Sequence, residues 1–302
     1  MNAEPQPPRN PGPSWGFGFL LWAERWWPRC IFRAALMGGT WIALAFMPRQ
    51  RAHSREYLAI VLGRPPGTAE IWRHFFSFME SLMLNLRAGR GVPLTCRLEP
   101  KNKEAFEQLA NSPAPALFGT FHFDSSDLLG YLLATQNRPV SIIRLQVENS
   151  GDTRLLARRF GENISFLWIN NPANLLFDLK AAIEAGQSLA LKCDRLAYSA
   201  KTEAFEFLGA RRLFPFTIYY LSVLFSQSVV FCTAITAEVA DEIKVFSSPV
   251  FVPEPDATRE KNLESARTHF QGVLADLEKL LRQNPYLWFN FLPLNPAVSA
   301  DY

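Results

Sequence analysis

The sequence predicts an α/β fold: a mostly parallel central sheet with helices on both faces, preceded by an N-terminal helical region. From about residue 95 onward, short apolar runs alternate with helical patterns, which is typical of strands joined by crossover helices. Residues 15–90, by contrast, have a helical pattern throughout. With 302 residues, 48% of them hydrophobic, the chain has enough apolar material for a full core. We therefore divide it into a helical region at 1–94 and an α/β domain at 95–302.

The N-terminal region carries the basic excess of the chain. Residues 1–95 contain eleven Arg, no Lys, no Asp and five Glu, a balance of +6, whereas the whole chain has a net charge of +3. Five of the eight Trp lie between residues 15 and 41. The uncharged run at 34–47 is shorter than the roughly 20 residues of a membrane span. Indole and guanidinium groups suit the level of lipid headgroups, so we expect an amphipathic helix that lies in the interface.

This interpretation predicts that the protein binds an anionic membrane surface through residues 15–55. Two alternatives remain open for the same segment. It could be a hydrophobic cap packed on the α/β domain, or it could span the bilayer.

Within the helical region, apolar residues recur at helical spacing over 72–83, and glycine and proline at 89–93 end the pattern. The strands expected in the α/β domain are 116–121, 140–145, 164–168, 188–193, 229–235 and 243–246. The helices expected there are 103–110, 125–134, 153–160, 172–185, 214–225 and 257–283. The last of these has one apolar stripe and ends before Asn284-Pro285.

A second uncharged stretch runs over residues 213–237. Its pattern changes midway, from a buried helix at 214–225 to a buried strand at 229–235. We therefore assign it to the core of the domain and not to a membrane.

Several classes of protein are excluded by composition. Cys30, Cys96, Cys193 and Cys232 form no C-x-x-C pair, and the four His share no ligand-like spacing, so neither a disulfide framework nor a metal site is expected. Arginines at 25, 29 and 33 interrupt the first apolar stretch, which argues against a signal peptide. Basic and aromatic residues do not interleave along the strands, so nucleic acid is not an expected partner.

The chemistry concentrates where the strand at 116–121 ends. His122 follows that strand and Asp127 follows five residues later, at the edge where open α/β sheets place their sites. Imidazole is suited to take a proton from a hydroxyl near neutral pH, and a carboxylate can fix its tautomer. The pair therefore forms a candidate dyad that activates a substrate hydroxyl. An alternative is that Asp124 and Asp127 merely cap the following helix.

The His122-Phe-x-x-x-Asp127 block resembles the H-x4-D block of the lysophospholipid acyltransferase superfamily, and within it the bacterial lipid A late acyltransferases. Further elements of the resemblance are the Arg144-bearing strand, the segment 182–195 that ends in Asp194-Arg195, the loop Glu206-Phe-Leu-Gly209 and the closing Pro285-x-x-Trp288. The ordered series covers about residues 14–292. It implies a glycerolipid acyltransferase-like fold.

The resemblance also implies an O-acyltransferase that moves an acyl group from a thioester, on acyl carrier protein or coenzyme A, to a hydroxyl of a lipid or lipid-like acceptor. No cofactor is implied beyond the acyl thioester as co-substrate. His122 would be the general base and Asp127 its orienter, with Asp124 as a possible secondary carboxylate. The implied substrate-binding residues are Phe123, Arg144, Asp194, Arg195, Glu206 and Gly209. The implied location is the cytoplasmic face of the inner membrane, peripheral or monotopic.

The sequence departs from the lipid A branch at Asp124, Arg195 and Asn290. These departures leave aryl polyenes and other secondary metabolites open as the acceptor class. Two other functions stay open as well. A thioesterase-like hydrolase would use the same thioester with water, and a non-catalytic membrane scaffold would not depend on His122.

Overall fold

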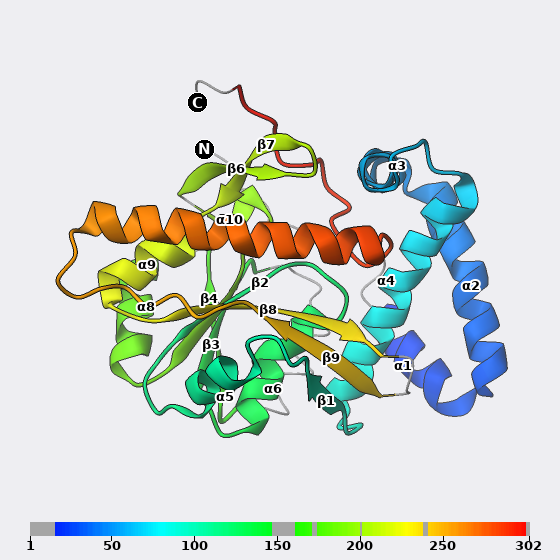
Figure 1. Cartoon of the computed structure of the whole chain (residues 1–302). Helices are drawn as coiled ribbons and strands as arrows, with labels where there is room; N and C mark the ends of the chain where they lie inside the picture. The colour runs from blue at the N-terminus through cyan, green and yellow to red at the C-terminus, as the bar shows by residue number, and fades with distance from the viewer. Residues whose placement is uncertain (1–15, 147–160, 171–173, 200, 238–240, 300–302) are drawn as a thin grey trace, which may run out of the picture.

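The computed structural model describes residues 16–146, 161–170, 174–199, 201–237 and 241–299. The helix expected at 153–160 lies outside this part of the chain. In Figure 1 the N-terminal helices lie beside the central sheet and the helices that cover it.

From residue 16 onward, the described part of the N-terminal region has four helices: α1 (Gly16–Trp26), α2 (Arg29–Phe46), α3 (Pro48–Leu62) and α4 (Thr68–Gly89). Prolines set two of the boundaries, because Pro28 precedes α2 and Pro48 is the first residue of α3. Gly63 ends α3 in the left-handed conformation, with φ +67°, which glycine adopts without steric cost. Helices α2 and α3 both pack on α4.

In the part of the chain that the structure describes, the central sheet has seven strands in the order β1-β9-β8-β2-β5-β3-β4. Their bounds are β1 Thr95–Leu98, β2 Leu117–Thr120, β3 Val140–Arg144, β4 Ile164–Trp168, β5 Ser188–Lys192, β8 Val229–Thr236 and β9 Glu242–Ser247. All neighbours are parallel except β8 and β9. The predicted mostly parallel sheet is therefore confirmed.

Helices cover both faces of this sheet, as expected (Figure 1). On one face lie α5 (Lys103–Asn111) and α6 (Leu129–Thr135), the latter preceded by the 3-10 turn η1 (Ser125–Leu128). On the other lie α8 (Leu175–Glu184), α9 (Thr217–Phe225) and α10 (Arg259–Gln283). Helix α4 contributes to the cores on both faces of the sheet. Ile71 packs in the core on the face covered by α9 and α10, and Leu84 packs in the core on the face covered by α5 and α6.

All six expected strands are present, and the described residues contain three further strands that were not predicted. One is β1, and the other two form a hairpin of β6 (Thr202–Phe207) and β7 (Ala210–Pro215). The hairpin turns at Leu208 and Gly209, both with positive φ. Because β7 takes up residues as far as Pro215, helix α9 begins three residues later than expected. The helix-then-strand interpretation of 213–237 is confirmed by α9 and β8.

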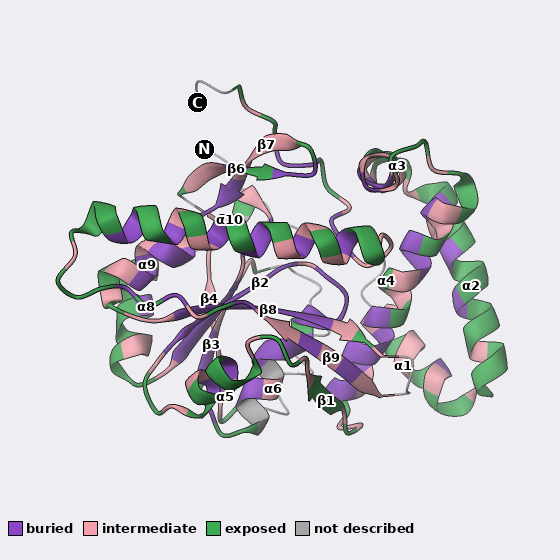
Figure 2. Ribbon diagram, viewed as in Figure 1, coloured by how far each residue is buried: buried purple, intermediate pink, exposed green. Residues whose placement is uncertain are grey.

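Large apolar side chains are exposed on α1 and α2, and α2 is mostly exposed in Figure 2. Trp22, Trp26, Trp41, Ile42 and Phe46 are 51%, 67%, 50%, 62% and 82% exposed, respectively. Among the described residues, one helix is long and apolar enough to cross a bilayer by length and composition, namely Arg29–Phe46.

Candidate active site

The register of β2 and β5 brings the site together. These strands are parallel neighbours, and Thr120 pairs with Lys192 at their carboxyl ends. His122 and Asp194 each follow two residues after that pair. Parallel strands end at the same edge of a sheet, so the two side chains meet although 72 residues separate them.

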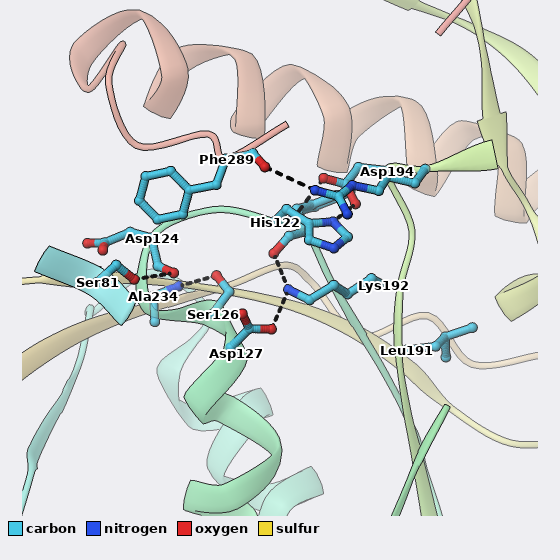
Figure 3. Close-up of polar contacts among 12 residues, drawn as sticks. Ser81, His122, Asp124, Ser126, Asp127, Leu191, Lys192, Asp194, Ala234 and Phe289 are labelled. Atoms are coloured by element: carbon cyan, nitrogen blue, oxygen red, sulfur yellow. Dashed lines mark hydrogen bonds and ion pairs between the residues drawn. The ribbon is translucent and has the colours of Figure 1, made fainter. Parts of the chain in front are cut away.

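Asp194 makes two hydrogen bonds with His122, and Figure 3 shows the two side chains next to each other. Its Oδ1 lies 2.7 Å from the imidazole Nδ1, and its Oδ2 accepts from the backbone N–H of His122 at 2.9 Å. The same Oδ2 accepts from the indole N–H of Trp288 at 2.9 Å. Asp194 is completely buried, whereas the His122 side chain keeps 13% exposure. Asp194 is therefore held in the interior by its hydrogen bonds, whereas part of the imidazole ring is accessible from outside.

The charges of this pair suit proton abstraction. Burial opposes ionisation of Asp194, but the bonds from His122 and the charges of Arg195 and Lys192 hold the pKa of its carboxyl well below the ordinary range. Burial and the nearby Arg195 lower the pKa of His122 to about 4, against the attraction of Asp194. At neutral pH the imidazole is therefore neutral. Since an ionised carboxylate only accepts, the proton is on Nδ1 and the lone pair is on Nε2.

Asp127 has a different partner from the one expected. We expected it to fix the imidazole, but in the structure Asp194 makes the bond to Nδ1. Lys192 Nζ lies 2.9 Å from Asp127 Oδ1 and donates to the carbonyl of Phe121 at 3.0 Å. Burial of Asp127 raises its pKa, but the charges of Lys192 and then Arg144 outweigh this and keep the pKa low. The physical reason for the change is the β2–β5 register, which brings Asp194 level with His122, whereas Asp127 projects from η1.

Asp124 is a structural residue by its contacts. It adopts φ +36°, is 5% exposed, and its carboxylate accepts from the backbone N–H of Thr236 at 2.6 Å. Neither alternative expected for its side chain is seen. It makes no cap bond to η1, and no hydrogen bond joins its carboxylate to His122 among the contacts of the described residues. Burial raises the pKa of Asp124.

The two arginines expected in the site lie at its edge. Arg144 is the last residue of β3, and its charge acts on Asp127. Arg195 donates from Nη2 to the carbonyl of Phe289 at 3.0 Å and lies close enough to His122 to lower its pKa. Its Nε is buried and makes no hydrogen bond with any residue that the structure describes.

The remaining expected substrate-binding residues lie elsewhere. Phe123 is fully buried and forms an isolated antiparallel bridge with Trp288. Glu206 is an exposed residue of β6 whose backbone bonds Gln271 of α10, and Gly209 is in the turn of the hairpin. None of these three residues has a hydrogen bond to His122 or Asp194 among the contacts of the described residues.

Three residues that contact the site were not predicted to do so from the sequence. Lys192 pairs with Asp127, and Asn295 and Trp288 both donate to Asp194. The signal that indicates Lys192 is its place as the one charged residue of the expected strand 188–193, two positions before Asp194. Asn295 donates to the Asp194 carbonyl at 3.0 Å, across 101 residues, and no local pattern could have indicated that contact. In the described residues, no group of three or more His, Cys, Asp or Glu could hold a metal ion.

An imidazole at a strand end that is neutral at pH 7 and bonded to a buried carboxylate is chemically able to accept a proton from a hydroxyl or a water. The chain belongs to the bacterial lipid A biosynthesis acyltransferase family, because the model of that family matches residues 9–294. It is thus a member of an acyltransferase family. A comparison with curated proteins found no match. Among solved structures, the 1-acyl-sn-glycerophosphate (LPA) acyltransferase PlsC from Thermotoga maritima has a TM-score of 0.37 at 11% identity, covering 85% of this chain and 98% of that one.

Proposed function

We propose that the protein is an O-acyltransferase that moves an acyl group from a thioester to a hydroxyl of a lipid or lipid-like acceptor. The observation that supports it most is the hydrogen bond between His122 Nδ1 and Asp194. That bond leaves the basic lone pair of a neutral imidazole on Nε2. Membership of an acyltransferase family supports the thioester chemistry.

In the proposed mechanism, Nε2 of His122 takes the proton of the acceptor hydroxyl as its oxygen attacks the thioester carbonyl. The C–O bond forms, the carbonyl oxygen becomes an oxyanion, and the imidazolium is stabilised by the Asp194 carboxylate. When the tetrahedral intermediate collapses, the C–S bond breaks and the leaving sulfur takes the proton from His122. An ester and a free thiol result, and His122 is neutral again.

Asp127 and the cations around it have supporting roles in this proposal. The Asp127–Lys192 ion pair sets the charge beside His122. Arg144 and Arg195 bind an acceptor phosphate or carboxylate or stabilise the oxyanion, because guanidinium groups suit planar, bidentate contacts. The buried Nε of Arg195, without a partner in the described residues, supports its role.

The donor in this proposal is acyl carrier protein or acyl-coenzyme A, and the acceptor is a lipid or a lipid-like secondary metabolite such as an aryl polyene. The protein would lie on the cytoplasmic face of the inner membrane, attached through α1 and α2. The exposed Trp and Ile side chains of these helices support attachment at the headgroup level.

The test separates transfer from hydrolysis. Purified full-length protein is incubated with an acyl thioester, and thiol release is followed with and without a hydroxylic lipid in vesicles. We expect release to require the lipid and an acyl ester to form in equal amount. Equal release without the lipid, with free fatty acid as the product, would instead indicate a thioesterase-like hydrolase.

A further inference from the structure

Trp288 connects the candidate active site to the N-terminal helices. Its indole is 2% exposed and donates to Asp194 Oδ2 at 2.9 Å. Its own peptide carbonyl lies 2.8 Å from Nε2 of His74, a residue of α4 that is 214 positions earlier in the chain. One tryptophan therefore bonds both the catalytic-domain carboxylate and the helical region.

The donor and acceptor of every bond around His74 can be assigned. A peptide carbonyl only accepts, so His74 Nε2 carries the proton. Nδ1 must then accept, and it lies 2.8 Å from the hydroxyl of Ser54 on α3. Burial lowers the pKa of His74 to about 4, so the ring is neutral and this tautomer is fixed at pH 7. Both His74 and Ser54 are fully buried.

Packing by itself does not require a histidine here. The ring of His74 is surrounded by aromatic residues, with the centroids of Phe291 and Tyr57 at 4.6 and 5.5 Å. A phenylalanine would fill such a place without the cost of burying two polar nitrogens. The imidazole is distinctive because it has a donor and an acceptor at opposite ends of one rigid ring.

We propose that His74 is a positioning residue for the acyl-transfer reaction, acting on His122 through Trp288 and Asp194. The line of bonds runs from Ser54 to His74, Trp288, Asp194 and His122. By holding the Trp288 peptide, His74 keeps the indole N–H on Asp194 Oδ2, and that bond keeps Oδ1 directed at the imidazole. The inference rests on the proposed role of His122 as the general base.

Two substitutions of His74 form a matched pair. Glutamine is long enough to place an amide N–H where Nε2 stands, so His74→Gln keeps the bond to the Trp288 carbonyl. Asparagine is shorter and places its amide near Nδ1, so His74→Asn keeps the Ser54 contact and loses the Trp288 contact. We expect kcat to fall about tenfold or more in His74→Asn and less than threefold in His74→Gln, with KM unchanged in both.

The third variant is Trp288→Phe, which keeps an aromatic ring at this position, although a smaller one, and removes the indole N–H. Without that donor the Asp194 charge is less satisfied and attracts the imidazolium more strongly, which raises the pKa of His122. The acid limb of the pH–rate profile should move to higher pH in Trp288→Phe and in His74→Asn. The double variant His74→Asn/Trp288→Phe should be no slower than Trp288→Phe alone, because both act on one bond.

Each result supports or overturns the inference. Provided that His122→Ala is inactive, any one of three results would overturn the positioning role. These are an equal loss of kcat in His74→Asn and His74→Gln, an acid limb of the pH–rate profile that does not move, and additive losses of kcat in the double variant. If His122→Ala stays active, the proposed function fails, and this inference fails with it. Circular dichroism melting of each variant identifies loss of fold. If His74→Asn does not fold, the pH–rate profile of Trp288→Phe is the deciding measurement. An acid limb at the wild-type pH in that variant would overturn the inference.

Discussion

The Asp194 carboxylate bonds His122 at two points, the imidazole Nδ1 at 2.7 Å and the backbone N–H at 2.9 Å. It therefore fixes both the rotation of the ring and the backbone from which the ring projects. The imidazole is thus bonded to a residue that follows the neighbouring strand β5 and not to the nearer aspartates of its own loop.

Asp127→Asn should lower the rate and move its pH dependence, whereas Asp124→Asn should do neither. Removing the Asp127 charge leaves Lys192 uncompensated near the imidazole, so the pKa of His122 falls. We expect kcat/KM to drop about ten- to a hundredfold, with the acid limb moving to lower pH. Asp124→Asn should cost only about 1 kcal/mol of stability through its weaker bond to Thr236. Equal kinetic damage from both would mean that Asp124 shares the role.

Stability should fall as the pH drops from about 6.5 to about 4. His74 has a pKa near 6.5 in the unfolded chain and about 4 when folded, so the unfolded state binds the extra proton in this window. Its contribution is complete above the unfolded pKa and is lost on acidification, on the order of 3 kcal/mol. Urea unfolding at several pH values measures the slope, and His74→Gln should reduce it. An unchanged slope in that variant would contradict the buried, neutral assignment.

Gly119→Ala should destabilise the protein by about 1–3 kcal/mol. A Cβ at this position of β2 would lie 2.5 Å from the Phe231 ring, which stacks on Phe121. Gly272→Ala is the control, because a Cβ in the middle of α10 meets nothing within 4 Å. It should stabilise the helix by up to about 1 kcal/mol. Thermal melts of both variants check the prediction, and equal effects would contradict the close packing of Phe231 over β2.

The full-length protein should sediment with anionic vesicles, and high salt should weaken but not eliminate the binding. Replacing Arg25 and Arg29 with Gln should remove the salt-sensitive part. Replacing the exposed Trp22, Trp26 and Trp41 with Ala should remove most of the remainder. Arg33→Gln is a poorer probe, because Arg33 pairs with Glu80 at 3.3 Å. Complete recovery of the wild type in the supernatant at low salt would favour the cap alternative.

The fold was more predictable than the site, for a physical reason. Buried parallel strands such as 164–168 are local apolar runs, and a pattern of neighbouring residues is enough to find them. The hairpin at Thr202–Pro215 was missed because its strands mix Glu and Arg with the apolar residues. His122 could be placed in the candidate site because it directly follows a recognisable strand. Its partner Asp194 was named only as a substrate-binding residue, because strand order and register decide which loops meet, and sequence spacing contains neither.

The most direct test of the account compares Asp194→Asn with His122→Ala in the acyl-transfer assay. An asparagine amide at position 194 can donate to Nδ1, which puts the ring proton on Nε2 and removes the basic lone pair from the acceptor side. We expect a loss of about 10³–10⁴-fold in kcat for Asp194→Asn, comparable with that of His122→Ala and far larger than that of Asp127→Asn. Melting temperatures and circular dichroism establish that both proteins are folded. A folded Asp194→Asn protein that retains more than half of the wild-type turnover would contradict the account.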